Sequence, residues 1–157
     1  MVRKTKTIQY YEAVGRRRES VARVRLYILG KEKLALVPGL KEGEKIKVKA
    51  GEIIVDGVDY TKRFPSVHAR AALISPLALT KTEGRFAISI ILTGGGRKGQ
   101  LDAVILGISR ALNIVDKDEY RGALKKEGLL TRDSRTRERR KVGTGGKARR
   151  QKQSPKR

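Results

Sequence analysis

The stretch FAISIILTGGGRKGQLDAVILGISRAL, residues 86–112, decides the fold of this chain. Its first part predicts a strand over Arg85 to Thr93, because apolar side chains recur there with period two. Those core-facing positions are Phe86, Ile88, Ile90 and Leu92. Its last part predicts an amphipathic helix, because apolar side chains recur there at i, i+3, i+4 and i+7. Those positions are Leu101, Val104, Ile105, Ile108, Ala111 and Leu112.

Further strands are predicted before this unit. The segment Arg18 to Leu29 alternates, which places one set of side chains in a core and another outside. The inward set is Ala22, Val24, Leu26 and Ile28, and the outward set is Arg23, Arg25 and Tyr27. Residues 30–50 predict a hairpin or a loop excursion, with Ile46 and Val48 inward between Lys45, Lys47 and Lys49. A strand at 53–55 then meets Asp56-Gly57, a turn pair.

Two more helices are expected around the central unit. Ser66 to Leu79 predicts a helix on Val67, Ala71 and Ile74, which Pro76 should end or kink. A short helix should follow the long one, with Asp116 and Glu119 as a capping box and a stop at Gly128. Strands first and helices later predict an α+β fold, a sheet with helices on one face. We expect a basic arm at 1–10, a globular domain at 11–130 and an extended basic tail at 131–157.

The charge of the chain indicates a polyanionic partner. Lys and Arg number 38 and Asp and Glu number 16, for a net charge of +22. Residues 131–157 hold twelve of the cations and two of the acids, so they carry +10 and leave +12 on residues 1–130. This tail lacks Leu, Ile, Phe, Tyr and Trp, so alone in water it should be disordered. Nucleic acid is the expected partner, because the tail lacks the apolar face that membrane binding needs.

Several classes of function find no support in the sequence. There is no Cys, and His68 is the single histidine, so neither a metal constellation nor a catalytic set is expected. No apolar run is long enough for a membrane span, and a secretory signal core is not recognisable. We therefore expect a non-enzymatic protein without a cofactor in a cytosol-like compartment.

The glycine loop, residues 94–100, has several interpretations. It satisfies Gly-x-Gly-x-x-Gly, the dinucleotide fingerprint, which requires a parallel strand after the helix. The loop can instead hold a phosphate of an RNA backbone at the helix N-terminus, or serve only as a tight turn. We favour the turn and the RNA contact together. The loop residues expected to touch RNA are Gly94, Gly95, Gly96, Arg97, Lys98, Gly99 and Gln100.

Basic side chains at a strand entrance and in the tail extend the expected RNA surface. The entrance group is Arg16, Arg17, Arg18, Arg23 and Arg25, which lacks the Lys-Ser/Thr of a nucleotide P-loop. The tail group is Arg132, Arg135, Arg137, Arg139, Arg140, Lys141, Lys147, Arg149 and Arg150. Low aromatic content favours backbone and shape contacts to folded RNA over base stacking.

These motifs together resemble the small-subunit ribosomal protein nine family, in its bacterial or organellar form. The matching segments are Gly15 to Leu26, the loop at 94–100 with Ile108 to Leu112, Ala123 to Asp133, Lys147 to Arg150, and Lys156-Arg157. The order of the motifs makes the resemblance specific, although residues 27–50 are longer than the common pattern.

The resemblance implies a fold like the second domain of ribosomal protein S-five, with a four-stranded sheet and a left-handed βαβ crossover. It also implies a structural role in the head of the small subunit, bound to the 3′ major domain of its rRNA beside neighbouring head proteins. The family tail extends toward the P site, so Lys156 and Arg157 inherit a contact with the anticodon stem-loop of P-site tRNA. A cytoplasmic ribosome is expected, with an organellar one open. The alternatives are a nucleotide-binding enzyme and a free-standing RNA chaperone.

Overall fold

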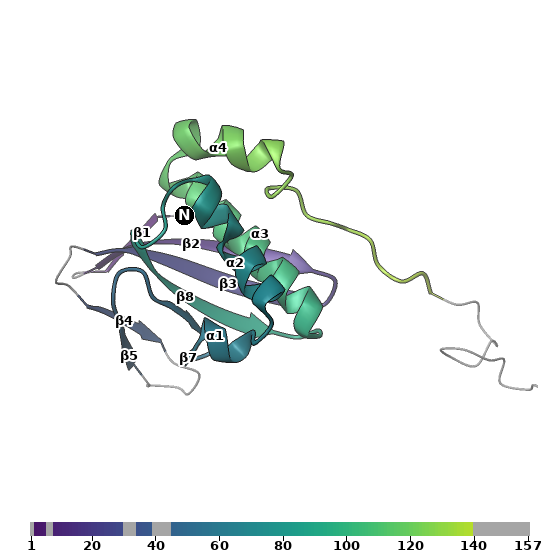
Figure 1. The fold of residues 1–157 in the computed structure, drawn as a ribbon, viewed down its shortest axis with the longest axis horizontal. Coiled ribbons are helices and arrows are strands. Elements are labelled where there is room, and N and C mark those ends of the chain that lie inside the picture. Colours follow the sequence, from purple (N-terminus) through teal and green to yellow (C-terminus); the bar gives the residue numbers. More distant parts are fainter. Residues whose placement is uncertain (1, 6–7, 30–33, 39–44, 140–157) are drawn as a thin grey trace, which may run out of the picture.

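The computed structural model describes residues 2–5, 8–29, 34–38 and 45–139, which form an α+β domain. The strands are β1 Val2–Thr5, β2 Ile8–Arg17, β3 Ser20–Ile28, β4 Ala35–Pro38, β5 Lys45–Val48, β6 Ile53–Val55, β7 Val58–Asp59 and β8 Phe86–Thr93. The helices are α1 Tyr60–Arg63, α2 Val67–Leu79, α3 Arg97–Val115 and α4 Lys117–Lys126. Figure 1 shows the helices gathered over one face of the main sheet.

The main sheet has six strands in the order β1-β2-β3-β8-β6-β7. All neighbours are antiparallel except β6 and β8, which are parallel and are connected through α1 and α2. The implied four-stranded sheet is therefore wrong for the described residues. The difference arises partly at the N-terminus, where residues 2–5 and 8–10 are paired strand. Residues 1–10 were predicted as a basic arm, and the described part of them pairs with the main sheet.

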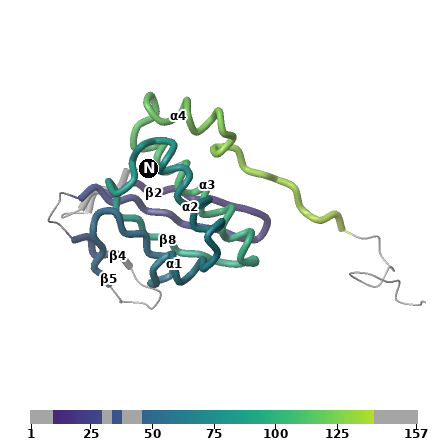
Figure 2. Tube along the Cα trace, in the orientation of Figure 1, coloured from purple at the N-terminus to yellow at the C-terminus, as the bar shows by residue number. Residues whose placement is uncertain are grey.

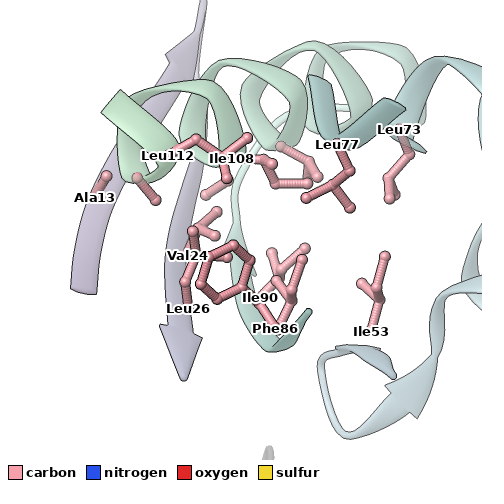
Figure 3. Packing of buried hydrophobic residues seen from close by; sticks show 14 of the residues in the cluster. Ala13, Val24, Leu26, Ile53, Leu73, Leu77, Phe86, Ile90, Ile108 and Leu112 are labelled. Atoms are coloured by element: carbon pink, nitrogen blue, oxygen red, sulfur yellow. The ribbon is translucent and has the colours of Figure 1, made fainter. Parts of the chain in front are cut away.

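The principal core lies between the main sheet and the helices (Figure 3). The predicted core positions of β8 are confirmed, because Phe86, Ile88, Ile90 and Leu92 all lie in this core, although Ala87 and Ser89 on the other face are buried as well. The stripe of α3 is largely confirmed, since Val104, Ile108, Ala111 and Leu112 are buried while Leu101 and Ile105 are partly exposed. Non-directional burial of these side chains is the main force holding α3 on the sheet.

A second cluster covers part of the opposite face of the main sheet. The predicted hairpin is confirmed as the antiparallel pair of β4 and β5, whose Val37 and Val48 are buried. This pair packs with Tyr27 and Ala87 of the main sheet. Tyr27 was predicted to face outward but is only 4% exposed, whereas Ile28 was predicted inward and is 41% exposed. Alternation along one strand cannot reveal that a separate hairpin covers its second face.

Helix α2 forms where predicted but buries a different stripe. Val67 is 70% exposed, and the buried positions are instead Leu73, Pro76 and Leu77. Pro76 does not end the helix, which continues to Leu79. Pro76 lacks the amide that would bind the carbonyl of Ala72, but the Ser75 hydroxyl donates to that oxygen at 2.9 Å. The side chain thus satisfies the group that proline leaves unpaired.

The two C-terminal helices have the predicted boundaries in outline. Asp116 caps α4, because its Oδ1 accepts from the amides of Asp118 and Glu119. Gly128 follows α4 with a φ of 70°, in the left-handed region that glycine adopts readily. Beyond it, residues 131–139 contain no helix or strand and leave the body, as the trace in Figure 2 shows. The rest of the predicted tail, 140–157, lies outside the described residues.

Candidate functional site

A basic groove lies where the β2–β3 turn, the first turn of α3 and the segment after α4 converge. Its volume is about 770 Å³. We call it the basic groove, and its lining residues are Arg17, Arg18, Glu19, Ser20, Gly95, Gly96, Arg97, Lys98, Gly99, Thr136 and Arg137. Five of these side chains are cationic and one is acidic, so the groove is suited to an anion.

The glycine loop turns tightly into α3. Gly94 and Gly95 have φ values of 67° and 64°, which favour glycine. Space also excludes a side chain, because a Cβ on Gly95 would lie 1.9 Å from Ser20 Oγ. The first-turn amides of any helix lack an intrahelical acceptor, and here the N-cap residue Gly96 has no side chain to accept from them. Arg97 and Lys98 are exposed beside them. Such an N-terminus attracts anions.

Ser20 lies beneath this loop at the start of β3. The residue is 1% exposed, and its Oγ has no hydrogen-bond partner within the described residues. A Cβ on Gly99 would come within 2.9 Å of that oxygen, so the hydroxyl sits close to the first turn of α3. A buried hydroxyl without a partner is costly, and it is a donor near the anion-attracting helix end.

Arg17 is engaged inside the protein. Its side chain is 13% exposed and pairs with Asp133, with Nη2 at 2.8 Å from Oδ2. Its Nε lies 3.6 Å from Oδ2 of Asp102 on α3. Nη1 donates to the carbonyl oxygens of Asp133 and Arg135 at 3.2 and 2.8 Å. The charge of Arg17 therefore serves mainly to fix the segment after α4 to the end of β2.

Arg25 is also paired, on the sheet face opposite the helices. Its Nε donates to Oε2 of Glu12 at 2.7 Å, and its guanidinium lies 5.1 Å from the ring centroid of Tyr10. Burial alone would lower the pKa of Arg25, but the hydrogen bond to Glu12 and the attraction of the Tyr27 phenolate, once ionised, outweigh it, so the net direction is upward. Arg23, two residues earlier, is exposed on the same face. Neither residue lines the basic groove.

The structure brings only part of the predicted RNA surface together. Arg17, Arg18, Arg97, Lys98 and Arg137 meet in the groove with Gly95, Gly96 and Gly99. Gln100 instead braces the turn, since its Nε2 donates to Gly94 O and its Oε1 accepts from Arg63. Arg16 is exposed outside the groove, and Arg132, Arg135 and Arg139 are exposed along the segment after α4. Those outside the described residues are Arg140, Lys141, Lys147, Arg149, Arg150, Lys156 and Arg157.

Sequence reasoning missed three contributors to this region: Ser20, Asp102 and Asp133. Asp133 had a recognisable signal. It is an acid in a basic segment, two residues before Arg135, which is the spacing of an Asx turn. Such a turn is present, because Asp133 Oδ1 accepts from the Arg135 amide at 2.9 Å. Asp102 and Ser20 carried no local signal, since their roles depend on partners distant in the sequence.

The described residues do not provide the context for dinucleotide binding. That fingerprint needs a parallel strand after α3, but α4 and then an extended segment follow through residue 139. Within the same residues, no group of three His, Cys, Asp or Glu side chains is arranged to hold a metal ion. No helix in this part of the chain is both long and apolar enough to cross a membrane.

A domain with a basic groove and a basic C-terminal extension has the electrostatic features of a nucleic-acid-binding protein. Comparison with known sequences agrees: residues 15–157 match the family described as Ribosomal protein S9/S16. The chain belongs to this family, whose role in the ribosome is structural and not enzymatic.

Two relatives carry the name small ribosomal subunit protein uS9. The protein from Bifidobacterium animalis subsp. lactis is 43% identical over 143 residues, which cover 91% of this chain and 75% of that protein. The protein from Solidesulfovibrio magneticus is 43% identical over 138 residues, which cover 88% of this chain and 90% of that protein. The resemblance inferred from the motifs is thereby confirmed.

Proposed function

We propose that this chain is a structural protein of the small ribosomal subunit that binds small-subunit rRNA in the head. The observation that carries this proposal is the basic groove at the N-terminus of α3. Family membership adds support, because both relatives above are named as small-subunit proteins. The rRNA segment expected is the 3′ major domain, and the other expected partners are neighbouring head proteins in a cytoplasmic ribosome.

The body is proposed to bind RNA through exposed cations and the first-turn amides of α3, which no N-cap side chain occupies. Arg18, Arg97 and Lys98 are exposed at the groove, and Arg16 and Arg23 are exposed on nearby strands. Phosphate oxygens are suited to both guanidinium groups and helix-terminal amides. Arg17 and Arg25 have carboxylate partners within the protein, so we assign them a supporting role in this surface.

The C-terminal segment is proposed to follow phosphate lines and to reach the P site. Arg132, Arg135 and Arg139 are exposed and begin this path. The remaining cations continue it in the sequence, and Lys156 and Arg157 are proposed to contact the anticodon stem-loop of P-site tRNA. Deleting these last two residues should weaken tRNA binding to assembled subunits by about 1 kcal/mol, the scale of a charge-assisted contact. Unchanged tRNA affinity would refute the assignment to tRNA.

The salt dependence of rRNA binding tests the central proposal. Each neutralised phosphate should contribute about −0.9 for a duplex or −0.7 for a single strand to the slope of log affinity against log salt concentration. We expect a slope steeper than about −3 in filter binding to small-subunit rRNA, since several cations are proposed to contact phosphates. A shallower slope would contradict binding by both groove and tail.

Sedimentation separates a ribosomal protein from a free-standing RNA chaperone. The protein should co-migrate with small subunits through a moderate-salt wash, because many phosphate contacts hold it at once. Loss of co-migration, with RNA affinity retained in filter binding, would favour the chaperone. Calorimetry with NAD or ATP should detect no saturable binding, and saturation would favour the enzyme.

A further inference from the structure

One guanidinium fixes the start of the C-terminal segment to the body. Arg17 binds the carboxylate of Asp133 at 2.8 Å and the carbonyl oxygens of Asp133 and Arg135 at 3.2 and 2.8 Å. Two of these acceptors are backbone oxygens, so Arg17 fixes the backbone of this segment in addition to the Asp133 side chain. We call this set of contacts the Arg17–Asp133 latch.

Asp133 stabilises the same path from within the segment. Its Oδ1 accepts from the amide of Arg135 at 2.9 Å, and its Oδ2 accepts from Nη2 of Arg135 at 2.7 Å. The hydrogen bonds from Arg135, with the nearby charge of Arg17, lower the pKa of Asp133 well below its usual range. The carboxylate is thus ionised at neutral pH and bridges two arginines.

The latch holds the chain immediately before two residues that line the basic groove near the N-terminus of α3. The next residues along the chain, Thr136 and Arg137, line the basic groove together with Arg97 and Lys98. Loss of the latch would remove the contacts that hold the residues just before 136–137 to the end of β2. Ser20, buried and without a described partner, lies at the base of the groove.

We propose that the Arg17–Asp133 latch completes a two-walled site for an RNA phosphodiester, with Asp133 as its positioning residue. This inference rests on the proposed rRNA-binding function. One wall supplies first-turn amides and the cations of Arg97 and Lys98, and the other supplies Thr136 and Arg137. A phosphate binds more tightly when donors contact it from two sides. If the latch already fixes the positions of these donors, binding does not have to order them. An acidic residue therefore increases affinity for a polyanion.

Two variants with equal changes in charge test the proposal. Asp133→Asn and Glu138→Gln each remove one negative charge, but Glu138 is exposed and has no ion pair in the described residues. If charge alone mattered, both variants would bind rRNA slightly more tightly. We expect Asp133→Asn to bind a small-subunit rRNA fragment about fivefold to tenfold more weakly and with a salt slope reduced by about 1, as for one lost phosphate contact. Glu138→Gln should match or slightly exceed the wild type.

A double-mutant cycle separates positioning from general damage to the fold. Arg137→Ala should weaken rRNA binding in the wild type and have little further effect in Asp133→Asn, because the latch places Arg137 in the groove. Additive effects would overturn the proposal. The thermal midpoint of Asp133→Asn should stay close to that of the wild type, and a large decrease would assign its effect to folding.

Competition identifies the source of the phosphate. An unlabelled rRNA fragment should displace labelled rRNA, whereas inorganic phosphate and a 5′-mononucleotide should not do so at micromolar concentration. Displacement by the mononucleotide at that concentration would overturn the assignment to an RNA phosphodiester. If the wild type fails to bind rRNA, the proposed function fails. If it binds and both acid variants behave alike, only the latch proposal fails.

Discussion

The backbones of Gly15 in β2 and Gly107 in α3 lie in direct contact. A Cβ on Gly15 would come within 2.5 Å of the Gly107 amide nitrogen and 1.8 Å of the Ala103 carbonyl oxygen. A Cβ on Gly107 would lie 2.6 Å from Cγ2 of Val24. Two glycines from distant parts of the chain thus let α3 lie close against β2 and β3, which brings its N-terminus to the β2–β3 turn.

Replacing Gly15 with Ala should severely destabilise the domain. The added methyl group would overlap backbone atoms of α3, which cannot move without displacing the helix from the sheet. We expect the free energy of unfolding in urea to fall by about 3 kcal/mol, the upper range for overpacking. Gly122→Ala is the control, because a Cβ at this site in α4 meets no atom within 4 Å. It should stabilise the protein by about 0.5–1 kcal/mol. Equal effects of the two substitutions would refute the close approach.

Asp56 should contribute to stability through both its backbone and its side chain. It adopts a φ of 51° in the β6–β7 turn, and its Oδ1 accepts from the Leu92 amide at 2.8 Å. Asp56→Ala should lower the free energy of unfolding by about 2–3 kcal/mol, through backbone strain and a lost partner for a partly buried amide. Asp56→Asn keeps an acceptor oxygen and tolerates this φ, so it should cost less. The reverse order in urea unfolding would contradict this explanation.

Substitution of Arg25 should mainly affect stability, whereas substitution of Arg23 should mainly affect rRNA binding. Arg25 pairs with Glu12 and is 19% exposed, so Arg25→Ala should lower the free energy of unfolding by about 1–2 kcal/mol. Arg23→Ala should change it by less than about 0.5 kcal/mol, because its side chain is exposed. Arg23→Ala should instead weaken rRNA binding and reduce the salt slope by about 1, if it meets one phosphate. Urea unfolding and filter binding of both variants provide the comparison.

The Arg17–Asp133 latch should persist in mild acid. The pKa of Asp133 is lowered by hydrogen bonds from Arg135 and by the charge of Arg17. A lowered pKa means that the stabilisation is fully present above the ordinary value for Asp, about 3.9, and is lost as the pH falls through the lower value of the folded state. The amide proton of Arg135 should therefore keep its folded chemical shift at pH 4. In Asp133→Asn this amide should show no acid transition, and a wild-type transition above pH 4 would contradict the latch.

The amphipathic patterns made much of the fold predictable from sequence. Apolar residues recur with the period of a strand at 86–93 and with the period of a helix at 97–115. Each period fits only one type of secondary structure, so the pattern predicts both the element and its buried face. The Asp56-Gly57 turn and the Asp116 cap were also predictable, because they depend on short-range chemistry. The strands at 2–5 and 8–17 were missed because their sequences lack a clear apolar alternation, and they pair as strand through hydrogen bonds to neighbouring strands.

Charge and composition by themselves determined the class of partner, because a large excess of cations favours a polyanion however the chain folds. Only the tertiary structure decided which cations are available. It pairs Arg17 with Asp133 and Arg25 with Glu12, while it leaves Arg97 and Lys98 exposed at the N-terminus of α3. An ion pair depends on distance in space, and residues 17 and 133 approach each other only after the sheet, α3 and α4 have packed.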